Sequence, residues 1–330
     1  MIRLLLAFLT SFISSVVVMP WLIKFFRRRS AGQTILGYVE NHKDKNGTTT
    51  MGGVLFMLVV LGLAFVFLNY DVNWFMVLLV GLFFGVLGLM DDYLKVKYKQ
   101  NLGLRAYQKI IGQLGISVIF AVFIYLSIGG GIGVPFSLKN FDIKWLIIPL
   151  IIVVLIATSN SVNLTDGLDG LAGTTSLIYL IFFTAITSIY SYRLYHEGET
   201  GHILSDIQSI NILSMLLAGS ILGFLMFNTS KASIFMGDVG SLCLGGYIGA
   251  SACLLGFELI LPILAFCFVF SSVSVILQVI SFKLTKKRIF KMAPFHHHLQ
   301  MSGLSEPKIV AIYAAVTISL GIICIIFYLL

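Results

Sequence analysis

Five polar segments interrupt an otherwise apolar chain, and their residue types suit metal and phosphate chemistry. They are "NHKDKNGTTTMGG" (41–53), "DDYLKVKYKQNLGLRAYQK" (91–109), "NSVNLTDGLDGLAG" (160–173), "FNTSKASIFMGDVGS" (227–241) and "KMAPFHHHLQMSG" (291–303). Carboxylate oxygens are the ligands that Mg²⁺ and Mn²⁺ prefer, and lysine ammonium groups bind phosphate. Carboxylates, a divalent metal ion and lysines together are typical of sites for phosphoryl transfer. In that reaction, catalysis consists mostly of positioning and charge neutralisation.

Two adjacent carboxylates, Asp91 and Asp92, directly follow the apolar run "GLFFGVLGLM". If this run is a helix, they lie at its C-terminal end, where unsatisfied carbonyl groups favour cations over anions. Positive charge is therefore expected nearby, from Lys95, Lys97, Lys99 or a metal ion. Successive helical side chains point about 100° apart, so the two carboxylates are not expected to chelate one ion side by side. The alternative is a solvated helix end with an Asp91–Lys95 ion pair.

A second set of polar residues recurs at every third position of the segment 160–173, namely Asn160, Asn163, Asp166 and Asp169. On helical turns this spacing stacks amide and carboxylate groups along roughly one face. The Asp-Gly pairs also fit turns and a helix N-cap. Because the four groups interrupt sequence at membrane depth, where polar residues are costly and usually functional, a binding role is favoured.

The segment 227–241 places Asn228 and Asp238 on either side of Phe235 and several small residues. Gly237 permits close approach of the backbone to a ligand. Phe235 is either a stacking surface for a planar base or an aromatic anchor at the membrane interface. Asp238 precedes the next apolar run, so it is either a ligand in the site or a simple helix cap.

Three consecutive histidines, His296, His297 and His298, form the least ordinary segment. Histidine nitrogens bind zinc, but adjacent histidines on a rigid segment are poorly placed to direct three nitrogens to one ion. Hard oxygen ligands are available elsewhere in the chain. The histidines, counted with the lysines as cations, are therefore expected to grip phosphate or to arrange the site, and the alternative is a set of solvated loop residues.

The segment 41–53 supplies Lys45 and three threonines ahead of a glycine pair that opens the second apolar run. It lacks the Gly-Lys-Ser/Thr order of a phosphate-binding P-loop. A phosphate contact from Lys45 and Thr50 is nevertheless expected, and helix capping by threonine is the alternative.

Composition indicates which elements position these segments. Of the 330 residues 58% are apolar and 11% charged, and the mean hydropathy of +1.00 lies outside the range of soluble globular proteins. Apolar runs long enough to span a membrane as helix cover 3–24, 51–70, 74–90, 109–129, 145–159, 170–190, 209–227, 239–255, 257–282 and 307–330. A β-barrel would show short alternating segments instead. The sequence predicts an all-α integral membrane protein of about ten transmembrane helices, forming a single domain over 1–330.

The distribution of positive charge orients these spans. Lys and Arg residues divide 18 to four between the two sides, and the richer side is expected to be cytoplasmic. Both termini then lie outside, and all five polar segments share the cytoplasmic face, where they can converge on one site. This topology and anionic lipid account for the net charge of +8, so no nucleic-acid partner is expected. The four cysteines fall inside apolar runs and are expected to be packing residues.

The segments "MDDYLKV", "NSVNLTDGLDGLAG", "FNTSKASIFMGDVGS" and "APFHHHLQ", in this order among the spans, resemble the polyprenyl-phosphate N-acetylhexosamine-1-phosphate transferase superfamily. The triple histidine and "TMGG" are similar to its bacterial peptidoglycan branch. The resemblance implies transfer of phospho-MurNAc-pentapeptide from UDP-MurNAc-pentapeptide to undecaprenyl phosphate, giving lipid I and UMP, with Mg²⁺ as cofactor. It also implies a multi-pass protein of the bacterial cytoplasmic (inner) membrane, in contact with membrane lipids and as a homodimer.

The resemblance also implies roles for individual residues. Asp91 and Asp92 match the essential acidic pair and, with the magnesium ligand Asp238, form the metal set, while the three histidines complete the catalytic residues. Residues matched to the nucleotide and its surroundings are Asn163, Asp166, Asp169, Asn228, Gly237 and Ser241, with Phe235 as the uracil platform. Lys45, Thr50 and Asn160 match positions near the lipid phosphate, and Lys95 and Lys109 match phosphate or nucleoside contacts. The chain departs from the pattern at Thr49, where proline is usual, and at Gln300, a peripheral position where glutamate is usual.

Direct displacement is the expected reaction, with Asp91 assisting deprotonation of the lipid phosphate and Asp92 in a structural or electrostatic role. A two-step route through an aspartyl-phosphosugar is the alternative. Two other functions stay open: transfer of GlcNAc-1-phosphate to the same kind of lipid, and secondary transport of an anionic solute, which would concentrate charge near the middle of the membrane.

Overall fold

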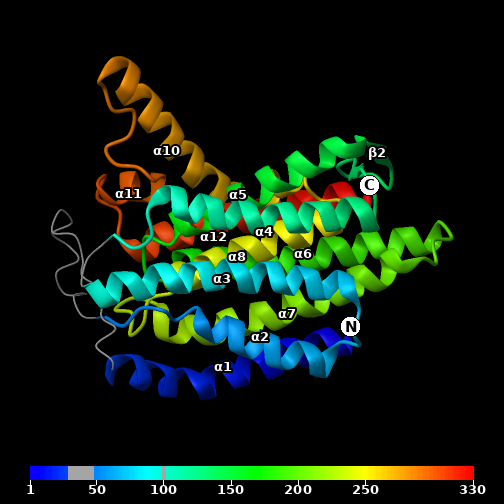
Figure 1. Ribbon diagram of the computed structural model, residues 1–330, viewed down its shortest axis with the longest axis horizontal. Helices are drawn as coiled ribbons and strands as arrows, with labels where there is room; N and C mark the ends of the chain where they lie inside the picture. The colour runs from blue at the N-terminus through cyan, green and yellow to red at the C-terminus, as the bar shows by residue number, and fades with distance from the viewer. Residues whose placement is uncertain (29–47, 99–101) are drawn as a thin grey trace.

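The computed structural model describes residues 1–28, 48–98 and 102–330. Lys45 and Lys99 lie outside these ranges. The helices are α1 (Ile2–Arg28), α2 (Val54–Phe67), α3 (Val72–Tyr98), α4 (Ala106–Ser127), α5 (Ile147–Thr165), α6 (Leu171–His196), α7 (His202–Asn228), α8 (Gly237–Leu254), α9 (Leu261–Leu264), α10 (Phe266–Thr285), α11 (Phe295–Gln300) and α12 (Glu306–Leu329). An antiparallel hairpin of β1 (Gly131–Gly133) and β2 (Asn140–Asp142) follows α4. Most long helices run side by side in one bundle, and α10 leans away from it (Figure 1).

Each of the ten predicted apolar runs coincides with a helix, and the run 257–282 covers both α9 and most of α10. Within the described ranges, eight helices are long and apolar enough to cross a membrane: α1, α3, α4, α5 with the short turn before it, α6, α7, α10 and α12. The remaining two, α2 with 14 residues and α8 with 18, are not among them. The chain is therefore an all-α, multi-pass membrane protein, and the count of ten crossings stays a prediction.

Helix α8 is the central element of the bundle, since every residue from Val239 to Leu254 is buried. Its glycines allow neighbouring helices to approach closely. A Cβ atom on Gly245 would lie 2.4 Å from the Cα of Ser159 on α5, and one on Gly88 of α3 would lie 2.2 Å from the carbonyl oxygen of Asp238. This packing brings the end of α3, the end of α5 and the start of α8 together at one end of the bundle, on the left in Figure 1.

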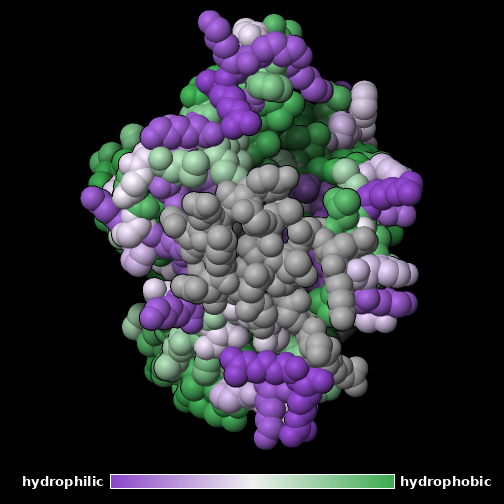
Figure 2. Space-filling model, turned by 90° about the vertical axis from the view of Figure 1, so that its left-hand side faces the viewer, coloured by the Kyte–Doolittle hydropathy of each residue, from purple (hydrophilic) through white to green (hydrophobic). Residues whose placement is uncertain are grey.

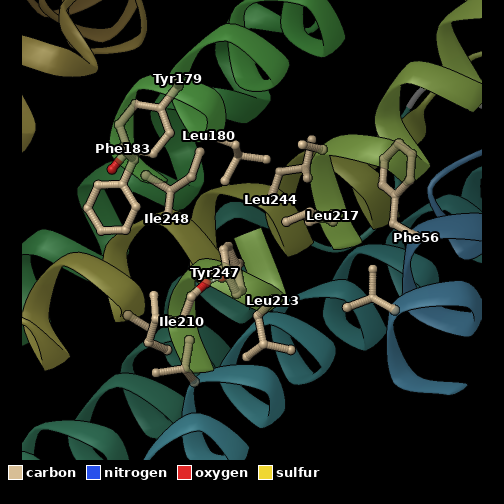
Figure 3. Close-up of a cluster of buried hydrophobic side chains, with 14 of the residues drawn as sticks. Phe56, Tyr179, Leu180, Phe183, Ile210, Leu213, Leu217, Leu244, Tyr247 and Ile248 are labelled. Atoms are coloured by element: carbon tan, nitrogen blue, oxygen red, sulfur yellow. Dashed lines mark hydrogen bonds between the residues drawn. The ribbon is translucent and has the colours of Figure 1, made fainter. Parts of the chain in front are cut away.

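The apolar core lies further along the bundle, where α2, α6, α7 and α8 meet (Figure 3). Some polar groups inside it are paired with neighbours, as expected where hydrocarbon offers no water. The hydroxyl of Tyr247 lies 3.0 Å from that of Ser214 and 3.2 Å from the carbonyl oxygen of Ile210. The core therefore fixes α8 against α7 at a distance from the polar end.

Candidate active site

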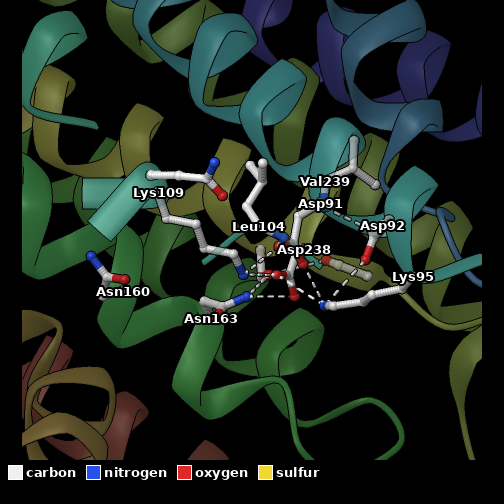
Figure 4. A network of polar contacts seen from close by, with 12 residues as sticks. Asp91, Asp92, Lys95, Leu104, Lys109, Asn160, Asn163, Asp238 and Val239 are labelled. Atoms are coloured by element: carbon white, nitrogen blue, oxygen red, sulfur yellow. Dashed lines mark hydrogen bonds and ion pairs between the residues drawn. The ribbon is translucent and has the colours of Figure 1, made fainter. Parts of the chain in front are cut away.

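Three carboxylates converge where α3 meets the first turn of α8. Asp91, Asp92 and Asp238 each offer one oxygen, and these oxygens all lie within 4.8 Å of one another (Figure 4). Gly88 makes the approach possible, since any side chain there would collide with the backbone of Asp238. Asp91 and Asp92 are buried. They are therefore not the solvated helix end that the sequence left open.

Two lysines neutralise this cluster. Lys95 Nζ lies 2.6 Å from Asp91, 3.2 Å from Asp238 and 3.7 Å from Asp92. Lys109, which comes from α4, lies 2.6 Å from Asp238 and 3.0 Å from Asp91. The expectation of positive charge beside the acidic pair is confirmed. Three carboxylates against two ammonium groups leave one net negative charge when all five are ionised.

Lys97, the other described lysine expected beside the pair, lies elsewhere. Its ammonium group is placed over the rings of Tyr93 and Tyr98, 5.8 Å and 5.6 Å from their centroids. Its side chain is exposed. Lys97 is therefore a surface residue, and it offers a matched comparison for the two lysines of the cluster.

Asp91 and Asp92 have different hydrogen-bond partners. Asp91 Oδ1 accepts the backbone N–H of Leu104 at 2.7 Å, while Asp92 Oδ2 accepts that of Val239 at 3.1 Å. Among the described residues, Asp92 Oδ1 accepts no hydrogen bond. The two carboxylates thus have different hydrogen-bond partners. Each nevertheless brings one oxygen within 4.8 Å of an oxygen of Asp238, so whether they share one ion stays a prediction.

The donor set fits a magnesium ion. All three groups are hard carboxylate oxygens. They lie within 4.8 Å of one another, and a shift of a few tenths of an ångström would bring them within the width of an octahedral Mg²⁺ shell, about 4.2 Å. The buried Oδ1 of Asp92 accepts no hydrogen bond in the described chain, and its nearest ion-pair partner, Lys95 Nζ, is 3.7 Å away. Such an atom is costly to bury unless a cation or a ligand completes it.

Asn163 orients the third carboxylate. Its Nδ2 donates to Asp238 Oδ1 at 3.0 Å and to the hydroxyl of Ser241 at 2.9 Å. Ser241 in turn donates to the carbonyl oxygen of Gly237 at 3.0 Å. Gly237 has φ +75°, and a Cβ on it would lie 2.4 Å from Asp92 Oδ2. Asn163, Ser241 and Gly237 thus hold the first turn of α8 against the carboxylates.

Asn160 lies one turn before Asn163 and is held by a residue that the sequence reasoning missed. Its Nδ2 donates to Gln113 Oε1 at 2.8 Å and to the carbonyl oxygen of Ile156 at 2.7 Å. Gln113 is fully buried on α4, one turn after Lys109. A glutamine inside the apolar run 109–129 was the available signal.

Asp169 and Asn228 join two of the polar segments. Asp169 Oδ2 accepts the N–H of Ala232 at 3.2 Å, and Asn228 Oδ1 accepts the N–H of Gly170 at 3.0 Å. Asn228 also donates to the carbonyl oxygen of Ile234 at 2.8 Å. Both side chains are buried. The hydrogen bonds of Asp169 and Asn228 hold segments 160–173 and 227–241 together.

Asp166 ends α5 beside the cluster. Burial raises its pKa well above the ordinary value, and the negative charges of Asp238, Asp92 and Asp169 raise it further, in that order. The raised pKa means that this carboxyl takes up a proton more readily than a free aspartate does. Asp166 thus belongs to the same electrostatic unit as the metal set.

The histidines take different positions around the next residue, Gly167. A Cβ on Gly167 would lie 2.3 Å from His296 Nε2 and 3.1 Å from His297 Nε2. His296 is fully buried, and neither of its ring nitrogens has a hydrogen-bond partner among the described residues. His298 instead accepts the N–H of Lys291 at 3.1 Å. Two histidines therefore border the site, and the third holds its own loop.

The charge of the buried histidines differs from the expectation. Burial, followed by the charge of His297, lowers the pKa of His296 to about 3, so its ring is neutral at pH 7. Burial also lowers the pKa of His297, whose Nδ1 lies 3.1 Å from Gln300 Oε1. The expectation that the histidines supply positive charge for phosphate is wrong for His296. Gln300 is also not peripheral, because it contacts His297 directly.

The remaining predicted residues border the cluster. Strand-like pairing ties residues 49–53 to 234–236, with Phe235 N donating to the carbonyl oxygen of Thr49 at 2.7 Å. The buried hydroxyl of Thr50 has no hydrogen-bond partner in the described chain, and it lies beside Gly237. Phe235 is half-buried. The end of the molecule that carries these segments shows hydrophilic side chains around its rim (Figure 2).

Comparisons with known proteins show the family of this chain. The sequence pattern of glycosyl transferase family 4 matches residues 74–256. The chain is 40% identical to the phospho-N-acetylmuramoyl-pentapeptide-transferase of Halalkalibacterium halodurans over 98% of its length and 96% of that protein. For the proteins of the same name from Bacillus subtilis and Clostridium kluyveri the identity is also 40%, over 97% and 100% of this chain and 96% and 99% of theirs. The chain belongs to glycosyl transferase family 4 and, within it, to the phospho-N-acetylmuramoyl-pentapeptide-transferases.

Proposed function

We propose that this protein transfers phospho-MurNAc-pentapeptide from UDP-MurNAc-pentapeptide to undecaprenyl phosphate, producing lipid I and UMP. The observation that carries the proposal is the convergence of Asp91, Asp92 and Asp238 with Lys95 and Lys109 at one end of a membrane bundle. Family membership supplies the substrates, and the cluster supplies a place where two phosphate groups can meet.

Mg²⁺ is the proposed cofactor, held by Asp238 with Asp91 and Asp92. When bound, it would neutralise charge on the pyrophosphate and on the leaving UMP. Asn163 keeps Asp238 Oδ1 turned toward the cluster, and Lys95 and Lys109 hold its Oδ2. The lysines compete with the ion for the same oxygens, so we propose that they turn toward substrate phosphate when the site is loaded.

The proposed reaction is a direct displacement. An oxygen of the lipid phosphate attacks the β-phosphorus of the UDP-sugar, the bond from that phosphorus to the bridging oxygen breaks, and UMP leaves with this oxygen. Asp91 was the expected proton acceptor, but its oxygens already hold the Leu104 N–H, Lys95 and Lys109. Asp92 Oδ1 is less tightly held, since its ion-pair partner in the described chain, Lys95, lies 3.7 Å away. We therefore assign proton acceptance to Asp92 and positioning of the lysines to Asp91.

Substrate positions follow from the borders of the cluster. We propose that the nucleotide lies along Asn163, Asp166, Gly237 and Phe235, with the uracil ring on the half-buried face of Phe235. Asp169 and Asn228 shape this side through the backbone contacts described above. The lipid phosphate is proposed to enter near Thr50 and Asn160, with Lys45 as a further contact.

The membrane setting is proposed from the same comparison. We propose ten crossings in a single domain, both termini outside, the catalytic segments on the cytoplasmic face of the bacterial inner membrane, and assembly as a homodimer. The 18-to-four division of Lys and Arg supports this orientation.

Donor specificity tests the proposal. Purified protein is incubated with undecaprenyl phosphate, Mg²⁺ and either UDP-MurNAc-pentapeptide or UDP-GlcNAc, and UMP is measured. UMP from the first donor alone supports the proposal. UMP from UDP-GlcNAc alone would instead assign the rival hexosamine-phosphate transfer, and uptake of either nucleotide into vesicles without UMP release would indicate a transporter.

A further inference from the structure

Helix α10 is, with α1, one of the two least enclosed long helices of the described chain, and it leans away from the bundle (Figure 1). Its exposed side chains include Ile276, Leu277, Val279, Ile280 and Phe282. At 100° per residue these positions cover more than half of the helix circumference. Exposure of apolar side chains over so wide an arc, in a chain with eight candidate membrane spans among its described residues, favours contact of this arc with lipid acyl chains.

The remaining face of α10 is polar and carries the chain that follows it. Ser281 Oγ donates to the carbonyl oxygen of Lys287 at 2.9 Å. Gln278 Oε1 accepts the backbone N–H groups of Ile289 and Phe290 at 3.0 and 2.9 Å, and its Nε2 donates to the carbonyl oxygen of Phe290 at 2.9 Å. Ser274 Oγ accepts the N–H of Phe295 at 3.0 Å. Side chains of α10 therefore fix the returning segment along the helix.

This returning segment and the last turn of α10 carry a dense positive charge. The cationic tip comprises Lys283, Lys286, Lys287, Arg288 and Lys291, all of them exposed. The sequence holds no Asp or Glu between Glu258 and Glu306, and the ion pairs of Asp91, Asp92 and Asp238 are made with Lys95 and Lys109, not with the tip. Hydrophilic side chains gather over the end of α10 at the top of Figure 2. The tip therefore has an unbalanced charge of five positive groups.

We propose that the cationic tip is a binding surface for the headgroups of anionic phospholipids in the leaflet next to the active site. A cluster of four to eight Lys and Arg residues immediately after a span is the pattern that binds such headgroups. The apolar arc of α10 places the tip at headgroup depth, and exposed Leu284 and Ile289 beside the cations can enter the acyl boundary. The contacts of Gln278 and Ser281 hold the cations in a fixed arrangement, so little order has to be gained on binding.

A local probe of lipid composition tests this surface. A single cysteine is introduced as Ile289→Cys and labelled with an NBD fluorophore in the full chain, whose four native cysteines are buried. The protein is reconstituted in phosphatidylcholine vesicles that contain spin-labelled phosphatidylglycerol or spin-labelled phosphatidylcholine as quencher. The proposal predicts that phosphatidylglycerol quenches the tip label several-fold more strongly, since each cation near an anionic surface contributes about fivefold to local binding. Leu126 is exposed near the C-terminal end of α4, away from the active site. Leu126→Cys is therefore the matched control, and the ratio of quenching by phosphatidylglycerol to quenching by phosphatidylcholine should be near one.

Charge removal and salt complete the test. The variant K283Q/K286Q/K287Q/R288Q should lower the quenching ratio at position 289 toward one, whereas K283R/K286R/K287R should keep it. In the unsubstituted tip, 0.5 M NaCl should lower the ratio in the same way, because salt screens exposed charges; this arm does not depend on the folding of a variant. Equal quenching by the two lipids at position 289, or a ratio that survives both charge removal and salt, would overturn the proposal. Neither outcome depends on the transferase reaction.

Discussion

Lys109 Nζ on α4 lies 2.6 Å from a carboxylate oxygen of Asp238 on α8, and 3.0 Å from Asp91 at the end of α3. One ammonium group thus links three helices at the point where the carboxylates converge. Asp91 also accepts the N–H of Leu104, just before α4 begins. The start of α4 and the acidic cluster are therefore fixed by the same residues.

Removing this link should disable turnover. In K109M, Asp238 keeps Lys95, at 3.2 Å, as its remaining ion-pair partner in the described chain, and substrate phosphate loses a cation. The expected loss in kcat is about 100-fold or more, the size found when one preorganised charge-stabilising donor is removed. K97M, which deletes an exposed lysine over tyrosine rings, should stay within about twofold of the parent. Equal losses in the two variants would argue that bulk charge, not the link, matters.

Asn163 should control the affinity for the metal. N163A removes the amide that holds Asp238 Oδ1 at 3.0 Å, and loss of a group that orients a metal ligand typically costs about 10- to 100-fold in metal affinity. The Mg²⁺ concentration for half-maximal activity should rise by that factor. S161A, whose hydroxyl contacts Ser272 away from the cluster, is the control. An unchanged Mg²⁺ dependence in N163A would show that Asn163 does not orient the metal ligand Asp238.

Gly167 should be intolerant of any side chain. In G167A the new methyl group would lie 2.3 Å from His296 Nε2, so α11 has to shift away from the site. We expect activity to fall at least about tenfold, since small displacements in a positioned site are costly. G115A, where no atom lies within 4 Å of the added carbon, should keep full activity. Full activity in G167A would show that α11 can move freely.

The buried His296 should make stability depend on pH. Its pKa is lowered to about 3 by burial and by His297, from an ordinary value of 6.5. Between these values the unfolded state binds more protons than the folded state, so the free energy of unfolding falls as the pH is lowered from 6.5 toward 3. Unfolding temperatures at several pH values should fall less steeply in H296N than in the parent. H196N, at the exposed end of α6, should keep the parental slope, and an H296N slope equal to the parental one would refute the prediction.

Much of the architecture was predictable because the membrane imposes a simple length rule. All ten apolar runs coincide with helices, although α2 and α8 do not qualify as spans by length and composition. For α8 the reason is physical: its glycines and buried small residues serve close packing against α3 and α5, not contact with lipid. A hydropathy rule has no information about that burial.

The presence of positive charge beside the acidic pair was predictable, and the geometry of the cluster was less so. The acidic pair and its lysine partner follow from helix spacing, but the convergence of Asp91 and Asp92 on Asp238 depends on Gly88 admitting α8. Lys109 is separated from Asp238 by 129 residues, and no local pattern predicts that contact.

The directions of side chains in the polar segments could not be predicted from the sequence. Three adjacent histidines read alike in sequence, yet His296 and His297 approach Gly167 while His298 turns to Lys291. The neutral state of His296 follows from burial, which the polar appearance of the segment conceals. Gln113 was overlooked because a single amide in an apolar run carries little signal without its partner Asn160.

The most direct test of the central claim, that the carboxylate and lysine cluster carries phosphoryl transfer, is UMP release by D238N beside the parent. The reaction contains UDP-MurNAc-pentapeptide, undecaprenyl phosphate and Mg²⁺, and matched unfolding temperatures confirm folding. We predict UMP in equal amount to the lipid product from the parent, and a rate lower by at least about 1000-fold in D238N, as expected for loss of a metal ligand at a charge-stabilising site. A folded D238N protein that releases UMP at the parental rate would contradict the claim.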